Sequence, residues 1–201
     1  IAENLTRSNK LPIADTCPAC QEKTEIRRVN EVESLYCTNP SCPAKAIKAY
    51  TLFVSRDAMN IDGLSEMTLE KFIGHGLIHS LADIFRIQDH REVIVNLEGF
   101  GEKSFQNLAE SVERARRTTL PRLLYGLGIP NVGLAGAKLI CRAFEGNLER
   151  IRQAEPEEFS SIDGIGPVIA GSIAEYFRDS KKARDLDELL VFLDIQQEKV
   201  Q

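Results

Sequence analysis

Hydrophobic and polar positions change their period once along the chain, near residue 44. Before that point, residues 24–29 and 34–36 form two short runs with a polar turn around Asn30 and Glu31 between them, which predicts a β-hairpin. From Ala44 onward, apolar residues recur at helical spacing in amphipathic segments separated by short glycine-containing turns. The pattern predicts a mainly α protein, with a small β-hairpin module ahead of an all-α region.

The two ends of the all-α region show the same helical spacing. Residues 46–53 carry an apolar face that predicts a helix running directly out of the last cysteine of the module. The stretch from Lys181 to Gln201 is charged, with one apolar face around Leu186 and Leu189. It predicts a last helix followed by a frayed or truncated end, and we find no strand-like alternation beyond Tyr36.

Four cysteines lie in the β-hairpin module as Cys17-x2-Cys20 and Cys37-x4-Cys42, with sixteen residues between the pairs. Two close pairs separated by a short hairpin match the spacing of a tetrahedral thiolate site for Zn²⁺. The alternative is four reduced thiols without a ligand, which the polar surroundings disfavour because such cysteines are normally buried. Four thiolates leave no open position for water, so we expect a structural zinc finger with no catalytic role for the metal.

The fifth cysteine and the net charge narrow the functional classes. Cys141 stands in an apolar helical pattern and is expected to be a buried small hydrophobe.

An odd cysteine count without a visible signal peptide indicates a reducing compartment, hence the cytoplasm. No stretch is apolar enough to span a membrane, and the start at Ile1 in place of Met indicates a fragment of a longer protein. The net charge of -5 opposes a simple nucleic-acid binder, so any affinity for DNA must come from local groups.

One pentapeptide pattern, apolar-x-Gly-apolar-Gly, recurs four times in the all-α region. The copies are the first hairpin (Ile61–Ser65), the second (Leu97–Gly101), the third (Ile129–Gly133) and the fourth (Ile162–Gly166). Their third residues fall at positions 63, 99, 131 and 164, at intervals of 36, 32 and 33. Each copy follows one helical pattern and opens another, which predicts four tandem helix-hairpin-helix motifs.

The residue types of the hairpins suit the binding of phosphate. The third residue, Gly or Asn131, tolerates the left-handed backbone region, and the fifth begins a helix whose first amides stay open to a ligand. Such amides bind phosphate oxygens, so the hairpins are predicted to hold the nucleic-acid backbone without reading bases. One hairpin alone is more often a tight turn, but four at near-constant spacing favour binding. The candidate DNA-binding residues are Gly63, Leu64, Ser65, Gly99, Phe100, Gly101, Lys103, Val132, Gly133, Lys138, Gly164, Ile165 and Gly166.

A four-cysteine module followed by four such hairpins resembles the C-terminal half of bacterial NAD-dependent DNA ligases, over nearly the whole chain. The matching stretches are Cys37-Thr-Asn-Pro-Ser-Cys42-Pro43-Ala44, residues 53–64, residues 97–104, residues 124–129 and residues 162–167. The resemblance implies three segments: the tail of an oligonucleotide-binding-fold domain or a linker (1–12), the zinc finger with a connecting helix (13–54) and the helix-hairpin-helix domain (55–201).

The resemblance also implies a function for the parent enzyme. Such ligases seal nicks in double-stranded DNA during replication and repair with NAD and Mg²⁺, and their helix-hairpin-helix domain grips the minor groove. The chain has no Lys-x-Asp-Gly adenylation motif, so we expect no catalytic residue, no NAD site and no ligase activity in it. Its partners would be nicked duplex DNA and the missing catalytic domains, with no membrane, at the nucleoid in the bacterial cytoplasm.

Three hairpins depart from the family pattern. Ser65 replaces the second Gly of the first hairpin, Val168 stands where a Lys is common after the fourth, and Pro130-Asn131 makes the third degenerate. The second hairpin is the best formed, so Gly99, Gly101 and Lys103 are the leading candidates for DNA contact. Two alternatives stay open: a zinc-containing helix-hairpin-helix module of another repair enzyme, and a protein-interaction scaffold, which the acidic net charge favours.

Overall fold

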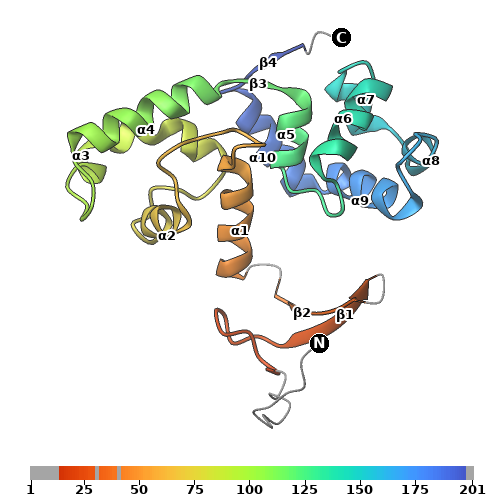
Figure 1. Cartoon of the computed structure of the whole chain (residues 1–201), viewed down its shortest axis with the longest axis horizontal. Coiled ribbons are helices and arrows are strands. Elements are labelled where there is room, and N and C mark those ends of the chain that lie inside the picture. Colours follow the sequence, from red (N-terminus) through yellow and green to blue (C-terminus); the bar gives the residue numbers. More distant parts are fainter. Residues whose placement is uncertain (1–13, 30–31, 40–41, 198–201) are drawn as a thin grey trace, which may run out of the picture. The chain divides into compact units, whose positions relative to one another are not determined.

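The computed structural model describes residues 14–29, 32–39 and 42–197, and it separates into two compact units, Ile1–Ala46 and Ile47–Gln201 (Figure 1). The predicted tail over 1–12 and the turn at Asn30 and Glu31 lie outside the described residues. Helix α1 (Pro43–Val54) crosses the boundary between the units. The predicted domain boundary after residue 54 stays a prediction.

The first unit is built on the predicted β-hairpin, which the structure confirms. Strands β1 (Thr24–Val29) and β2 (Val32–Cys37) pair antiparallel, with Ile26 opposite Leu35. Both of these side chains are exposed, and none of the strand side chains whose burial is described is buried. Among the described residues up to Ala46, only Cys17 and Cys42 are buried.

The second unit is helical, as predicted, apart from one short strand pair. Its helices after α1 are α2 (Glu66–Gly74), the 3₁₀ helix η1 (Ala82–His90), α3 (Arg91–Ile94), α4 (Glu102–Ala115), α5 (Leu120–Gly126), α6 (Leu134–Ala143), α7 (Leu148–Gln153), α8 (Pro156–Ser160), α9 (Pro167–Arg178) and α10 (Ser180–Leu190). Their apolar faces meet in one continuous core that contains the fully buried Phe53, Phe72 and Phe159. Cys141 is buried, as expected. No helix among the described residues has the length and apolar character needed to cross a membrane.

The first and second hairpins pack against each other. The backbone N–H of Asp62 donates to the hydroxyl of Ser111 on α4 at 2.8 Å, and that hydroxyl is fully buried. The Phe72 and Phe100 rings lie 5.2 Å apart between centroids, which joins α2 to the second hairpin. The two hairpins therefore form one packed pair.

The third and fourth hairpins form a second pair that packs in the same way. A methyl group placed on Gly164 would lie 3.1 Å from the Leu139 side chain on α6, and one on Gly136 would lie 3.9 Å from Ile165. In the first pair, Gly63 faces Leu108 on α4 in the corresponding way. In each pair, the helix that follows one hairpin thus covers the turn of the other.

A short parallel strand pair, which the sequence pattern did not predict, ties the C-terminal segment to the middle of the helical unit. Strand β3 (Arg117–Thr119) pairs with β4 (Asp194–Gln196), as Figure 1 shows. Arg116 supports this pairing by donating to the Phe85 carbonyl at 2.8 Å, and its guanidinium lies 5.6 Å from the centroid of the Phe192 ring. Three residues are too few to show strand alternation. Of the frayed or truncated end expected after the last helix, fraying is wrong for residues 194–196, which pair as β4.

Candidate functional site

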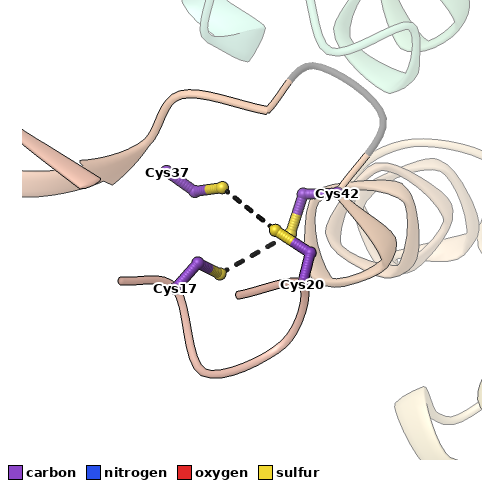
Figure 2. A group of neighbouring side chains, drawn as sticks. All are labelled: Cys17, Cys20, Cys37 and Cys42. Atoms are coloured by element: carbon purple, nitrogen blue, oxygen red, sulfur yellow. Dashed lines mark hydrogen bonds between the residues drawn. The ribbon is translucent and has the colours of Figure 1, made fainter. Parts of the chain in front are cut away.

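The four predicted metal ligands converge. The sulfur atoms of Cys17, Cys20, Cys37 and Cys42 all lie within 4.8 Å of one another (Figure 2). Cys17 Sγ lies 3.8 Å from Cys42 Sγ, and Cys20 Sγ lies 3.5 Å from Cys37 Sγ. Neither pair is close enough for a disulfide, which needs about 2.05 Å between sulfur atoms.

Tight backbone turns position the two cysteine pairs. After the first pair, Gln21 takes a positive φ of 62° and donates its N–H to the Cys17 carbonyl at 2.8 Å. At the second pair, the Cys42 carbonyl accepts the N–H groups of Lys45 and Ala46, so α1 begins directly at the last cysteine. The Lys45 ammonium then donates to the Cys37 carbonyl at 2.7 Å and joins the two parts of the second knuckle.

The distances between the thiols fit zinc. Four thiolates at about 2.3 Å from a tetrahedral Zn²⁺ have sulfur atoms about 3.8 Å apart, close to the separations observed here. Backbone N–H groups of Ala19 and Cys20 lower the pKa of Cys17 to about 7, whereas desolvation raises the pKa of Cys37 to about 12. A bound dication would favour the thiolate form of all four ligands, including Cys37. The residues present therefore suit structural zinc.

The predicted turn geometry is present in all four hairpins. The third residue has a positive φ in each: 90° at Gly63, 84° at Gly99, 64° at Asn131 and 87° at Gly164. In the last three hairpins, the fourth residue donates its N–H to the carbonyl of the first at 2.9 to 3.1 Å. A positive φ at the third residue, together with this hydrogen bond, is the pattern of a type II turn. Pro is common at the second residue of such turns. Pro130 therefore suits the third hairpin, whose turn matches the others.

The fifth residue of each hairpin is the N-cap of the following helix. Ser65 caps α2, Gly101 caps α4, Gly133 caps α6 and Gly166 caps α9, all with extended backbone. The first three amides of such helices have no partner within the helix. Leu64, Val132 and Ile165 are buried and Phe100 is half-buried, so a ligand at these fourth positions meets mainly main chain.

Open space surrounds the three glycine caps. A methyl group placed on Gly101, Gly133 or Gly166 would meet no heavy atom of the described residues within 4 Å. Their φ angles are ones that other residues adopt, so neither backbone strain nor packing against the described residues requires glycine at these positions. A ligand that approaches the helix amides closely does require a small residue there.

The first hairpin uses its own side chain as a cap. Ser65 Oγ accepts the N–H of Thr68 at 3.2 Å, which satisfies one amide that a phosphate would need. Acidic groups flank the turn as well, with Lys48 lying 3.4 Å from Glu66 and Arg114 lying 3.8 Å from Asp62. That the first hairpin binds phosphate poorly and serves packing stays a prediction.

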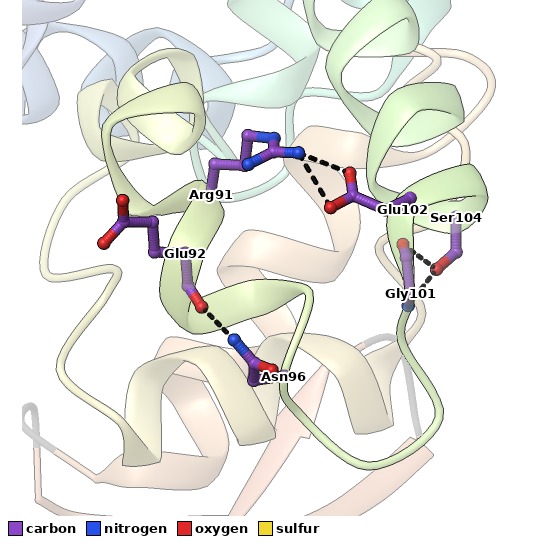
Figure 3. Close-up of polar contacts among 6 residues, drawn as sticks. All are labelled: Arg91, Glu92, Asn96, Gly101, Glu102 and Ser104. Atoms are coloured by element: carbon purple, nitrogen blue, oxygen red, sulfur yellow. Dashed lines mark hydrogen bonds and ion pairs between the residues drawn. The ribbon is translucent and has the colours of Figure 1, made fainter.

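The second hairpin is partly closed by its own residues (Figure 3). Ser104 Oγ accepts the N–H of Gly101 at 2.9 Å and donates to the Gly101 carbonyl at 3.0 Å. Glu102, the first residue of α4, forms a two-point ion pair with Arg91 at 2.6 and 2.7 Å. A phosphate at this hairpin therefore meets a nearby carboxylate and an amide that already has an acceptor, neither of which was foreseen from the sequence.

The two lysines named from the sequence are exposed, each on the helix that follows its hairpin. Among the described residues, neither Lys103 on α4 nor Lys138 on α6 has an ion-pair partner. The fourth hairpin has no such cation, because Val168 occupies the position that matches Lys103 and is 72% exposed. Cations are thus available at the second and third hairpins.

Comparison with known proteins finds two family matches along the chain. Residues 16–44 match the family of the NAD-dependent DNA ligase C4 zinc finger domain, and residues 122–186 match the helix-hairpin-helix motif, which includes the third and fourth hairpins. A DNA ligase of Ruminiclostridium cellulolyticum is 52% identical over 197 residues, which covers 98% of this chain and 30% of that ligase. A DNA ligase of Lachnoclostridium phytofermentans is 53% identical over 190 residues, covering 94% of this chain and 29% of the ligase.

A more distant relative shows the same relation. The DNA ligase of Symbiobacterium thermophilum is 40% identical over 174 residues, or 87% of this chain and 25% of the ligase. The chain thus spans at most 30% of the length of these relatives. The resemblance of the chain to the zinc-finger and helix-hairpin-helix regions of bacterial NAD-dependent DNA ligases is confirmed.

Proposed function

We propose that this chain is the DNA-binding part of an NAD-dependent DNA ligase, and that its hairpins hold the sugar-phosphate backbone of nicked duplex DNA from the minor groove. The observation that carries the proposal is the repeated pairing of a left-handed third residue with a helix N-cap at the fifth, found four times. Three of those caps are glycines with open space in front of them. Binding through main-chain amides needs few lysines, which suits a protein of net charge -5.

Within this proposal, the hairpins carry unequal shares. The candidate contacts are the main chain of Gly99–Gly101, Val132–Gly133 and Gly164–Gly166, with Lys103 and Lys138 adding charge. The first hairpin, Gly63–Ser65, contributes least because its own serine caps the helix. Contacts of this kind go to phosphates, so binding is expected to be independent of base sequence.

The metal has a structural role in the proposal. Zn²⁺ held by the four cysteines would fix the β-hairpin and the start of α1, and its closed ligand set leaves no position for substrate. The zinc finger thereby supplies a folded connection between the catalytic part of a ligase and the hairpins. Zn²⁺ takes no part in sealing the nick.

The activity proposed for the whole enzyme is the sealing of nicks in replication and repair, with NAD as the source of AMP and Mg²⁺ as the assisting ion. The chain itself has no Lys-x-Asp-Gly motif, so its own reaction with NAD should yield no covalent AMP. The domains that bind NAD and Mg²⁺ would be partners in the same protein. A bacterial cytoplasmic location at the nucleoid follows from this role.

Titration with labelled nicked duplex at several salt concentrations tests the proposal. Gly133→Asn should weaken binding by about tenfold or more, because the Asn side chain caps α6 and competes with phosphate for amides whose hydrogen bonds to charged groups contribute about 1.5–3 kcal/mol. Asn is also a good N-cap, so the unfolding midpoint should not fall. Gly74→Asn is the matched control, since Gly74 is exposed, has open space and lies outside every hairpin.

The outcome separates the alternatives. Binding that weakens with rising salt and is sensitive to Gly133→Asn supports the amide mechanism, because phosphate contacts release counterions. Absence of binding to duplex at low salt would leave a protein-interaction scaffold. Equal affinity for nicked and intact duplex, with no effect on a full ligase when the hairpins are changed, would favour a module of another repair enzyme.

A further inference from the structure

The outer face of α6, beyond the third hairpin, carries two cations that have no acidic partner among the described residues. Lys138 and Arg142 lie one helical turn apart, and both are exposed. Among the described residues, neither side chain takes part in an ion pair or a side-chain hydrogen bond. The two positive charges therefore lie one turn apart on an exposed helix face, in a chain whose net charge is -5.

The sequence between Glu113 and Glu145 contains no acidic residue. Residues 114–144 contain six Lys or Arg and no Asp or Glu, although the chain holds 30 acidic residues in 201. The other four cations of this stretch have internal partners. Arg116 and Arg122 donate to backbone carbonyls, while Arg114 and Arg117 lie 3.8 and 3.7 Å from carboxylates. Lys138 and Arg142 are therefore the two whose charge is available to a ligand.

The two cations continue the open N-terminus of α6. Ala135, Lys138 and Arg142 follow a spacing of three and four residues, so they lie on one face of the helix. Ala135 is the second residue after the Gly133 cap. The face thus starts at the amides of the third hairpin and runs along α6, with the cations about 5–6 Å apart at their Cβ atoms.

The same positions on the other hairpin helices carry no cation. Counted from each cap, the residues that match Lys138 and Arg142 are Gln106 and Glu110 on α4, Gly171 and Glu175 on α9, and Glu70 and Gly74 on α2. Each of these three helices has one glutamate in the pair. The feature is thus specific to the third hairpin and is not a general property of the repeat.

We propose that Arg142, together with Lys138, contacts the DNA phosphates next to the one held by the amides at Gly133. This inference rests on the proposed function and deepens it. Phosphates along one strand advance about 3.4 Å each along the duplex axis, and flexible Lys and Arg side chains one turn apart can each reach a different one. The third hairpin would then supply most of the salt-dependent part of binding.

Titration of the full chain with nicked duplex over a range of salt tests this assignment. Loss of one phosphate contact reduces the slope of log K against log salt by about 0.9, which is about eightfold in affinity at 0.1 M salt. Arg142→Ala should show that change, and Arg142→Ala with Lys138→Ala should lose about sixtyfold and a slope of about 1.8. Arg142→Lys should retain most of the affinity.

Arg184→Ala is the matched control. Arg184 is exposed on α10 and lacks an ion-pair partner among the described residues, so its removal changes the net charge equally. It should leave the affinity within about twofold and the slope unchanged. Equal behaviour of Arg142→Ala and Arg184→Ala, with wild type still binding, would overturn the assignment and leave the proposed function intact. Failure of wild type to bind would instead remove the proposed function itself.

Discussion

Each of the two units of this protein is stabilised in a different way. In the part of the first unit that the structure describes, the only buried residues are two cysteines, and the large apolar side chains Ile26, Leu35 and Tyr36 are 41% to 51% exposed. The helical unit instead buries a continuous core around Phe53, Phe72 and Phe159. Small units bury too little apolar surface to be stable without further support, and metal ligation can supply that support here.

The largest expected effect is the loss of the metal. Chelation of zinc, or Cys37→Ser, should unfold the first unit, because structural zinc contributes about 10–16 kcal/mol of apparent binding free energy to such folds. The helical signal should remain, since the core of the second unit contains no metal ligand. Circular dichroism and amide exchange with and without chelator measure both. Native protein that contains no zinc would contradict the role of the metal in the first unit. Helices that melt together with the hairpin would contradict the independent stability of the second unit.

A core substitution should have the reverse effect. Phe72→Ala removes a fully buried ring that also packs on Phe100, so it should destabilise the helical unit by about 3–5 kcal/mol. Zinc content should stay at one ion per chain. Met67→Ala on the same helix is the control, because Met67 is 78% exposed and its loss should cost less than about 0.5 kcal/mol. Release of zinc by Phe72→Ala would show that the units depend on each other.

Two glycines of the second hairpin separate backbone strain from openness. Gly99→Ala should cost about 1–2 kcal/mol, because Gly99 has a φ of 84° in the region that L-residues avoid. Gly101→Ser should leave stability nearly unchanged, since its backbone is extended and a methyl group there meets no atom of the described residues within 4 Å. Chemical unfolding of the helical unit measures both. If the two substitutions destabilise the helical unit equally, then glycine at position 101 is needed for the fold itself.

The smallest expected effect is the loss of the stabilising charge of Asp83 at low pH. Desolvation raises the pKa of Asp83, but the N–H groups of His79 and Ser80 and the Arg86 guanidinium outweigh it and hold that pKa below its usual value. A lowered folded pKa means that this contribution is present above the unfolded pKa of about 3.9 and is lost as pH falls through the folded pKa. Asp83→Asn should cost less than about 1 kcal/mol at pH 7 and nothing in strong acid. If Asp83→Asn still destabilises the protein at low pH, the effect comes from packing and not from the charge of Asp83.

Short-range chemistry explains why much of the fold was predictable. The spacing of the cysteines led to the metal centre, and the alternation over 24–29 led to β1. The glycine pattern led to four turns with a positive φ at the predicted residue. Strands β3 and β4 were missed because each has three residues and gains its place only from a partner more than seventy residues away. Arg142 was also missed, although the absence of acids over residues 114–144 was a signal for it.

The sequence by itself determined the ligands of the metal and the backbone conformation of each hairpin, because both depend on residue types within a few positions of one another. Only the tertiary structure decided which hairpin amides are engaged by Ser65 and Ser104, and that Arg91 pairs with Glu102. It also decided which cations have internal partners and which, like Lys138, are available. The physical reason is that charges and hydrogen bonds act through space, so the share of each repeated hairpin depends on neighbours that the folded chain brings to it.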